Sequence, residues 1–178
     1  MVHGLNQQGA LVSFFARSAL KSKKRFGGGV LEPSHYVEAL IRQTGSSDKK
    51  MANIEEASLL DGFEGIRSSY DKLDAAMFIL NVVRRTSQEG EVHGSDLFDL
   101  TGNALKVLES ESDLIKFRIH FIIRYLKMQG VLERLDWMNP FLAHPMSRGN
   151  LIPSINVPQI EKLKLESALE NYLAHAEA

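Results

Sequence analysis

The residues with the clearest chemistry in this sequence are five cations near its N-terminus. They are Arg17, Lys21, Lys23, Lys24 and Arg25, and three glycines follow at 27–29. Residues 1–31 contain these five Lys/Arg and no Asp or Glu, whereas the remainder contains sixteen Lys/Arg and twenty-two Asp/Glu. Ammonium and guanidinium groups displace the counterions condensed on a phosphate backbone, and glycines let the main chain approach it. The run therefore indicates nucleic-acid binding. The alternative is a charged turn that only faces solvent.

A second set of basic residues lies in segment 113–128, whose apolar residues have a helical period. Lys116, His120, Arg124 and Lys127 are spaced four, four and three apart, so they are predicted to project from one side of a helix. A helix that is apolar over most of its remaining surface is expected to sit between neighbouring helices. Two interpretations stay open. The strip is either the solvated back of a core helix or the basic border of a groove for an acidic, hydrophobic peptide.

Other chemistries lack the residues that they require. The chain has no cysteine, which excludes disulfides, thiol catalysis and cysteine-bound zinc. The six histidines are scattered, and the glycines at 27–29 follow the lysines, the reverse of the order in a phosphate-binding loop. We therefore predict no enzyme, no catalytic residue, no metal and no cofactor. No apolar run could span a bilayer and no signal peptide is evident, so we expect a soluble cytoplasmic protein.

The elements that would position these residues change in type at about residue 61. Segments 9–17, 36–42 and 51–60 are predicted strands, because they are rich in apolar residues and Gly/Ser turns separate them. Three strands make a small barrel or an open sheet with unpaired edges. We predict an α+β protein with a β domain at 1–61 and an α-helical domain at 62–178.

Helices are predicted at 66–85, from a cap at Ser95, at 113–128 and from Pro158 onward. Segment 131–158 holds most of the prolines and is predicted to be an irregular connector, in which Trp137 is a core anchor or lid, or an aromatic binding platform. The predicted apolar side of the first helix is Ile66, Tyr70, Leu73, Met77 and Leu80, widened by Ala76, Ile79 and Val83. That of the last helix is Ile160, Leu163, Leu165, Leu169 and Tyr172.

The run that begins at Gly9 resembles the N-terminal region of the RecO recombination mediators. It reads GALVSFFARSALKSKKRFGGGVLEP, and the similarity lies in the segment after the glycine, the basic loop and the Leu-x-Pro that follows. The later order is also similar to RecO: Leu60-Asp61-Gly62-Phe63 before a long helix, a Leu97-Phe98 helix, and Phe117-Arg118 in a helix that ends at Gly130. The resemblance covers about residues 5–135.

The resemblance implies a small OB-like β-barrel followed by an α-helical domain. It implies a non-catalytic protein of the cytoplasm and nucleoid that binds single- and double-stranded DNA, anneals complementary strands, and helps RecR load RecA onto DNA coated by single-stranded-DNA-binding protein. The implied DNA-binding residues are Arg17, Lys21, Lys23, Lys24 and Arg25, the same five that the distribution of charge in the sequence indicates. The family docks the acidic C-terminal tail of single-stranded-DNA-binding protein on its helical domain, and the residues carried over to that role are Lys116, Arg118, Arg124 and Lys127.

Two departures from the family pattern are expected to matter. Relatives usually have one or two further strands before the glycine that matches Gly9, so we expect an incomplete barrel here or a reading frame that begins upstream of Met1. Many relatives have a four-cysteine zinc site after the glycine that matches Gly130, and this chain has no cysteine. Segment 139–158 is therefore expected to be held by packing alone. The alternative function is a protein-interaction adaptor that uses the helical groove and binds little nucleic acid.

Overall fold

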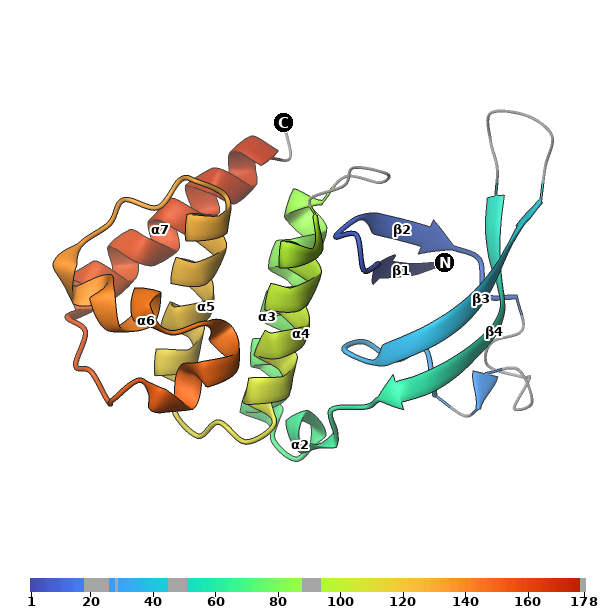
Figure 1. The fold of residues 1–178 in the computed structure, drawn as a ribbon, viewed down its shortest axis with the longest axis horizontal. Coiled ribbons are helices and arrows are strands. Elements are labelled where there is room, and N and C mark those ends of the chain that lie inside the picture. The colour runs from blue at the N-terminus through green and yellow to red at the C-terminus, as the bar shows by residue number, and fades with distance from the viewer. Residues whose placement is uncertain (18–25, 28, 45–50, 88–93, 177–178) are drawn as a thin grey trace.

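The structure, a computed structural model, describes residues 1–17, 26–27, 29–44, 51–87 and 94–176. Strands lie at one side of the molecule and helices at the other (Figure 1). The strands are β1 (Val2–Leu5), β2 (Leu11–Phe14), β3 (Tyr36–Thr44) and β4 (Met51–Asp61). The helices are α2 (Glu64–Arg67), α3 (Tyr70–Thr86), α4 (Ser95–Leu108), α5 (Leu114–Met128), α6 (Asn139–Ala143) and α7 (Gln159–Ala176), with short 3-10 helices η1 (Asp136–Met138) and η2 (Met146–Leu151). The predicted α+β class is therefore confirmed.

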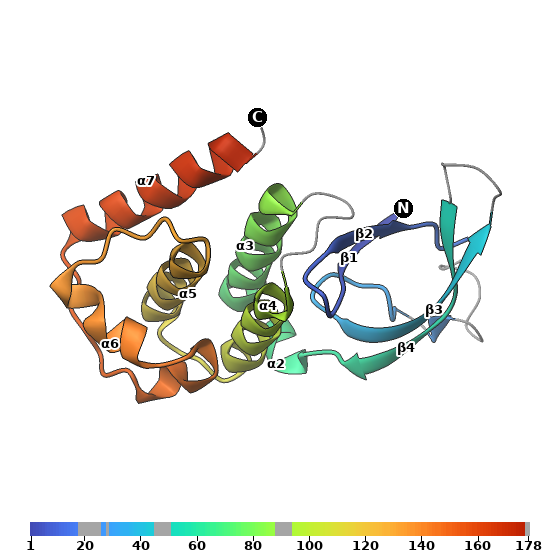
Figure 2. The ribbon, with the colours of Figure 1, turned by 45° about the horizontal axis from the view of Figure 1, so that its top comes forward.

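The strands form two antiparallel hairpins, β1–β2 and β3–β4. A parallel bridge joins them: Phe15 N–H donates to Ala52 O at 2.9 Å, and Ile54 N–H donates to Phe15 O at 2.9 Å. The strands follow one another in the order β1-β2-β4-β3 and curve around a small core of Phe26, Val30, Ile54 and Ala57 (Figure 2). The outer strands β1 and β3 are not paired with each other among the described residues. No closed barrel is present in this part of the chain, and the OB-like barrel stays a prediction.

Helix α5 is the centre of the helical part, as its apolar pattern predicts. Asp113 caps it, because the carboxylate accepts the backbone N–H of Lys116 at 3.0 Å. Its side chains are buried on several faces, and α3, α4, α6 and α7 all contact it. The buried members are Phe117, Ile119, His120, Phe121, Ile122, Ile123, Tyr125 and Leu126.

The predicted helix 66–85 is two helices, and its predicted apolar side is only partly correct, since Ala76, Ile79 and Val83 are buried. Ser69 has an extended backbone between α2 and α3, so the helical phase that starts at Ile66 does not continue into α3. Tyr70, Leu73 and Met77 are instead 82%, 38% and 45% exposed. The face of α3 that enters the core is Ala76, Ile79, Val82, Val83 and Thr86.

Three smaller expectations also differ from the structure. The cap of α4 is Gly94 rather than Ser95, and no side-chain capping bond is present there. In α7, Ile160 and Leu163 are exposed, whereas Leu165, Leu169 and Leu173 enter the core. The strand β1 was missed, because its sequence VHGL carries only two strongly apolar residues.

Segment 131–158 packs closely on the helices, although it contains only short helical turns. Five of its apolar side chains are buried in the main core: Met138, Phe141, Met146, Ile152 and Val157. Trp137 also packs against this core, with its ring edge-on to Phe141 at a centroid distance of 6.2 Å. This position favours the anchor interpretation of Trp137 over the exposed binding platform. No helix in the described ranges is long and apolar enough to cross a membrane.

The β strands and the helices meet at a joint around α2. Arg67 donates to Gly62 O at 2.7 Å, to Pro33 O at 3.2 Å and to Glu32 Oε2 at 3.2 Å. From α4, Lys106 pairs with Asp61 at 2.9 Å, and the N–H of Phe63 also donates to that carboxylate at 2.9 Å. These two donors hold the pKa of Asp61 below its usual value. Asp61 therefore stays ionised at neutral pH and keeps the end of β4 on α4.

We expect Arg67→Ala to lower the free energy of unfolding by about 1 kcal/mol, because it removes charge-assisted hydrogen bonds at a partly exposed site. Urea unfolding followed by circular dichroism measures the change. Arg84→Ala is the matched control, since Arg84 makes only a 3.4 Å contact with Asn81 within its own helix. Equal losses in the two variants would contradict a special role for Arg67.

Candidate functional site

The predicted DNA-binding loop connects two anchored points of the β core. Arg17 is exposed just after the bridge that Phe15 makes with β4. Lys21, Lys23, Lys24 and Arg25 lie outside the described residues. The next residue, Phe26, is 2% exposed and belongs to the small β core. The cationic run is therefore tethered at both ends to the same hydrophobic cluster.

The turn after this run is fixed to the helical part. Glu32 N–H donates to Gly29 O at 3.2 Å, and His35 Nδ1 lies 3.0 Å from Val30 O. The carboxylate of Glu32 then accepts from Arg67 of the α2 joint. The turn at residues 29–35, which follows the cationic run in the sequence, thus has a defined position relative to the helices.

The predicted basic strip of α5 does not form one solvated surface. Lys116 is half-buried and pairs with Glu111 at 3.3 Å, with only 13% of its side chain exposed. His120 is 1% exposed, because segment 144–149 covers it. Arg124 is half-buried and Lys127 is exposed. The interpretation as the solvated back of a core helix is wrong for His120 and holds only for the C-terminal end of the strip.

Arg118 lies apart from the other predicted partner-binding residues. Its guanidinium stacks on the ring of Phe78 at 3.9 Å, and its Nε lies 3.5 Å from Glu166 Oε1 of α7. It lines a groove between α3, α5 and α7, whereas Lys127 lines a cleft beside α6. The structure therefore does not bring the predicted set Lys116, Arg118, Arg124 and Lys127 into one groove.

His120 is held neutral inside the helical part. Its Nε2 lies 3.1 Å from His144 O, in the geometry of a donor to that carbonyl. Its Nδ1 is buried and has no partner among the described residues, and Gly149 packs so closely that a Cβ there would lie 3.2 Å from it. Burial lowers the pKa of His120 to about 4, the hydrogen bond to His144 opposes this shift, and Arg124 adds to it.

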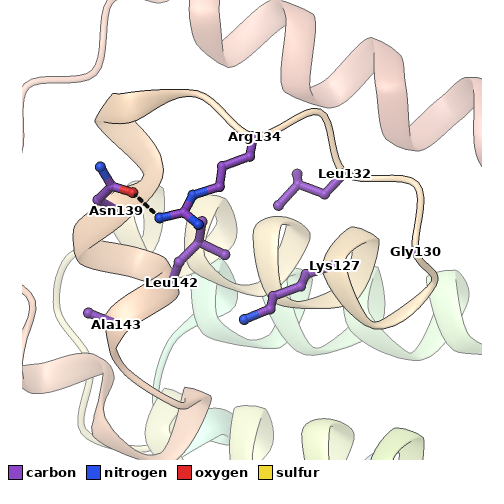
Figure 3. Close-up of a pocket in the computed structure, with 7 residues that line it drawn as sticks. All are labelled: Lys127, Gly130, Leu132, Arg134, Asn139, Leu142 and Ala143. Carbon is purple, nitrogen blue, oxygen red and sulfur yellow. Dashed lines mark hydrogen bonds between the residues drawn. The ribbon is translucent and has the colours of Figure 1, made fainter.

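The cleft at the end of α5 combines cations with apolar surface (Figure 3). It has a volume of about 550 Å³ between the end of α5, the following loop and α6. Figure 3 shows the side chains of Lys127 and Arg134 directed toward this space, and Arg134 donates to Asn139 Oδ1 at 2.8 Å. The lining residues are Lys127, Gly130, Leu132, Arg134, Asn139, Leu142 and Ala143.

This cleft suits an acidic chain that also carries apolar side chains. Neither Lys127 nor Arg134 makes an ion pair within the part of the chain that the structure describes, and leucines border both. Sequence reasoning found Lys127 but missed Arg134, Asn139 and Leu142, because they fall in a segment predicted only as a connector. The described residues contain no group of three His, Asp or Glu that could hold a metal ion.

Comparison with known proteins gives the family. The chain is 30% identical to the DNA repair protein RecO of Anaeromyxobacter dehalogenans over 125 residues, which is 70% of this chain and 48% of the relative. It is 33% identical to the DNA repair protein RecO of Syntrophus aciditrophicus over 121 residues, or 68% of this chain and 45% of the relative. The chain belongs to the RecO family.

A RecO of Syntrophobacter fumaroxidans is 28% identical over 130 residues, 73% of this chain and 50% of that relative. The chain thus spans about half the length of the curated relatives that it matches. No family model matches it. Each of these relatives is named DNA repair protein RecO.

Acidification tests the position of His120. Its folded pKa of about 4 lies below the ordinary value of 6.5, so between these pH values the unfolded chain binds more protons than the folded one. The free energy of unfolding is therefore expected to fall by about 3 kcal/mol through this group as the pH drops from 6.5 to 4. Urea unfolding at a series of pH values measures this loss.

The loss should be smaller by about 2 kcal/mol or more in His120→Gln, which keeps an amide donor for His144 O but cannot take up a proton. His175→Gln, on the exposed end of α7, should follow the wild-type curve. The same acid-induced loss in His120→Gln as in the wild type would show that burial of His120 is not its source.

Proposed function

We propose that this RecO-family chain is a DNA-binding recombination mediator. It would bind single- and double-stranded DNA, anneal strands, and assist RecA loading together with RecR and single-stranded-DNA-binding protein, without a catalytic step. The proposal rests mainly on the cationic run of residues 17–25, which contains no acidic residue. The described residues on both sides of this run contact the β core, and the chain is similar to DNA repair proteins. This function would place the protein at the nucleoid in the cytoplasm.

We propose different roles for two regions of the chain. Residues 1–61 would form an OB-like DNA-binding domain, and residues 62–178 a helical domain that recruits proteins. The bridge at Phe15 supports an OB-like arrangement, because it links the two antiparallel hairpins, and partly open barrels are built from strands joined in this way. Arg17, Lys21, Lys23, Lys24 and Arg25 would contact phosphates, and the release of counterions would supply most of the affinity.

The DNA-binding role predicts the behaviour of a quadruple variant, Lys21→Ala/Lys23→Ala/Lys24→Ala/Arg25→Ala. We expect it to lose about tenfold or more in affinity for single-stranded DNA, and the slope of log affinity against log salt to become shallower by about 2 to 3. Fluorescence anisotropy with a labelled oligonucleotide at several salt concentrations measures both.

The control removes four cations elsewhere, with Arg84, Arg148, Lys162 and Lys164 changed to Ala. It has the same net charge as the loop variant, so a difference between the two reports position rather than total charge. Similar losses in both variants, or unchanged binding in the loop variant, would reject the loop as the DNA contact.

The α5–α6 cleft is the site that we propose for an acidic partner. Lys127 and Arg134 would bind carboxylates, and Leu132 and Leu142 would take apolar side chains, which fits the acidic C-terminal tail of a single-stranded-DNA-binding protein. Of the residues predicted for this role, only Lys127 lines the cleft. In this proposal, Arg134 has the partner-binding role that the sequence analysis predicted for Arg118.

Charge reversal tests this assignment. Lys127→Glu/Arg134→Glu is expected to weaken binding of a peptide from that acidic tail by about tenfold or more, because repulsion replaces two attractive contacts. Isothermal titration calorimetry measures the affinity, and Lys162→Glu/Lys164→Glu on α7 is the charge-matched control. Equal weakening by the control would point to overall charge instead of the cleft.

A second candidate function is an adaptor that binds proteins through the cleft and binds little DNA. The cleft itself favours it, since its geometry is described, whereas most of the cationic loop lies outside the described residues. The two functions separate in the anisotropy experiment. Tail binding together with weak, non-specific DNA affinity in the wild type would favour the adaptor.

A further inference from the structure

A second groove lies between α3, α5 and α7, away from the cationic cleft. The three helices contact one another pairwise. The groove has a volume of about 460 Å³ and is lined by residues from all three helices. This volume lies within the range of sites that bind small molecules or the side chains of a partner.

One wall of the groove is acidic. Asp71 and Asp74 are exposed, one turn apart on α3, and neither makes an ion pair with another described residue. On the opposite wall Arg118 is already engaged, since it stacks on Phe78 and faces Glu166 at 3.5 Å. Its charge is thus largely compensated, and α7 adds a second cation, Lys162, to the lining. Asp71, Asp74 and Glu166 against Arg118 and Lys162 leave the groove with an excess of one negative charge.

The floor and the rim of the groove are apolar. Phe78, Leu114 and Leu165 contribute apolar surface from α3, α5 and α7 respectively. At the rim, Ile115 is 61% exposed, although it occupies the first turn of the most buried helix. A large apolar side chain left in solvent beside unpaired carboxylates is typical of a protein-binding surface.

We propose that the α3–α5–α7 groove docks a partner segment that carries apolar side chains next to lysine or arginine. The apolar side chains would lie on Phe78, Ile115 and Leu165, and the cation would pair with Asp71 and Asp74. The charge of this groove is opposite to that of the α5–α6 cleft, so the two surfaces select different partners and can be occupied together. This inference does not depend on DNA binding or on the acidic partner of the cleft.

Two synthetic peptides test the proposal on the full chain. Each is an amidated amphipathic helix of about 14 residues with leucines at i, i+3 and i+7; one carries lysines beside the leucines and the other carries glutamates at the same positions. Fluorescence anisotropy gives the affinity of each labelled peptide. The wild type is expected to bind the lysine peptide more tightly than the glutamate peptide at this groove.

The chain supplies a close control for charge reversal. Asp71→Lys/Asp74→Lys changes the groove, and Asp96→Lys/Asp99→Lys changes two exposed aspartates at the same helix positions of α4. We expect the α3 variant to weaken lysine-peptide binding by about tenfold and the α4 variant by less than about twofold. Lys127→Glu/Arg134→Glu should leave lysine-peptide binding at least as tight as in the wild type.

Ile115→Ser provides a second probe of the same surface, because it removes the exposed apolar side chain without disturbing the core or changing the charge of the groove. It should weaken binding of the lysine peptide even if the α3 variant folds poorly. Equal weakening by the α3 and α4 variants would mean that binding depends only on the net charge of the protein, and would overturn the proposal. Unchanged binding in both the α3 variant and Ile115→Ser would overturn it as well.

Discussion

The joint at α2 is the constraint on which the rest of the structure depends. Phe63 has a left-handed backbone (φ 44°), an unfavourable conformation for a large residue, yet its side chain is 5% exposed in the main core. The cost of this backbone conformation is offset by the contacts that the turn allows, between Asp61 and Lys106 and between Arg67 and Glu32. The β strands contact the helices a second time where Gly9 packs on Gly94 so tightly that a Cβ on Gly9 would collide with the Gly94 carbonyl.

This joint fixes the turn at residues 29–35 relative to the helical part. Arg67 reaches the turn just after the run, and Phe26 holds the same turn in the β core. In the helical part, segment 139–157 is held by buried apolar side chains and by the bond between His120 and His144, with no metal ligation by cysteine. Packing and a few charged contacts thus position every surface to which we assign a role.

Much of the fold could be predicted because it is encoded in local patterns. Apolar segments separated by Gly/Ser turns predicted β3 and β4, and the density of apolar residues on α5 predicted the centre of the helical part. The phase of α3 was predicted only in part, because a two-residue break at Ser68–Ser69 separates it from Ile66. The burial of His120 was missed for a similar reason, since segment 144–149, which covers it, is distant in sequence.

Only one of the two cations of the cleft could be predicted from the sequence, because Lys127 lies on a periodic helix and Arg134 on an irregular loop.

The central claim is that residues 17–25 bind the phosphate backbone of DNA. Acetylation footprinting of lysines with and without single-stranded DNA, read by mass spectrometry, tests it most directly. We predict protection of Lys21, Lys23 and Lys24 and none of Lys162 or Lys164. Unprotected loop lysines under conditions where DNA is bound would contradict the account.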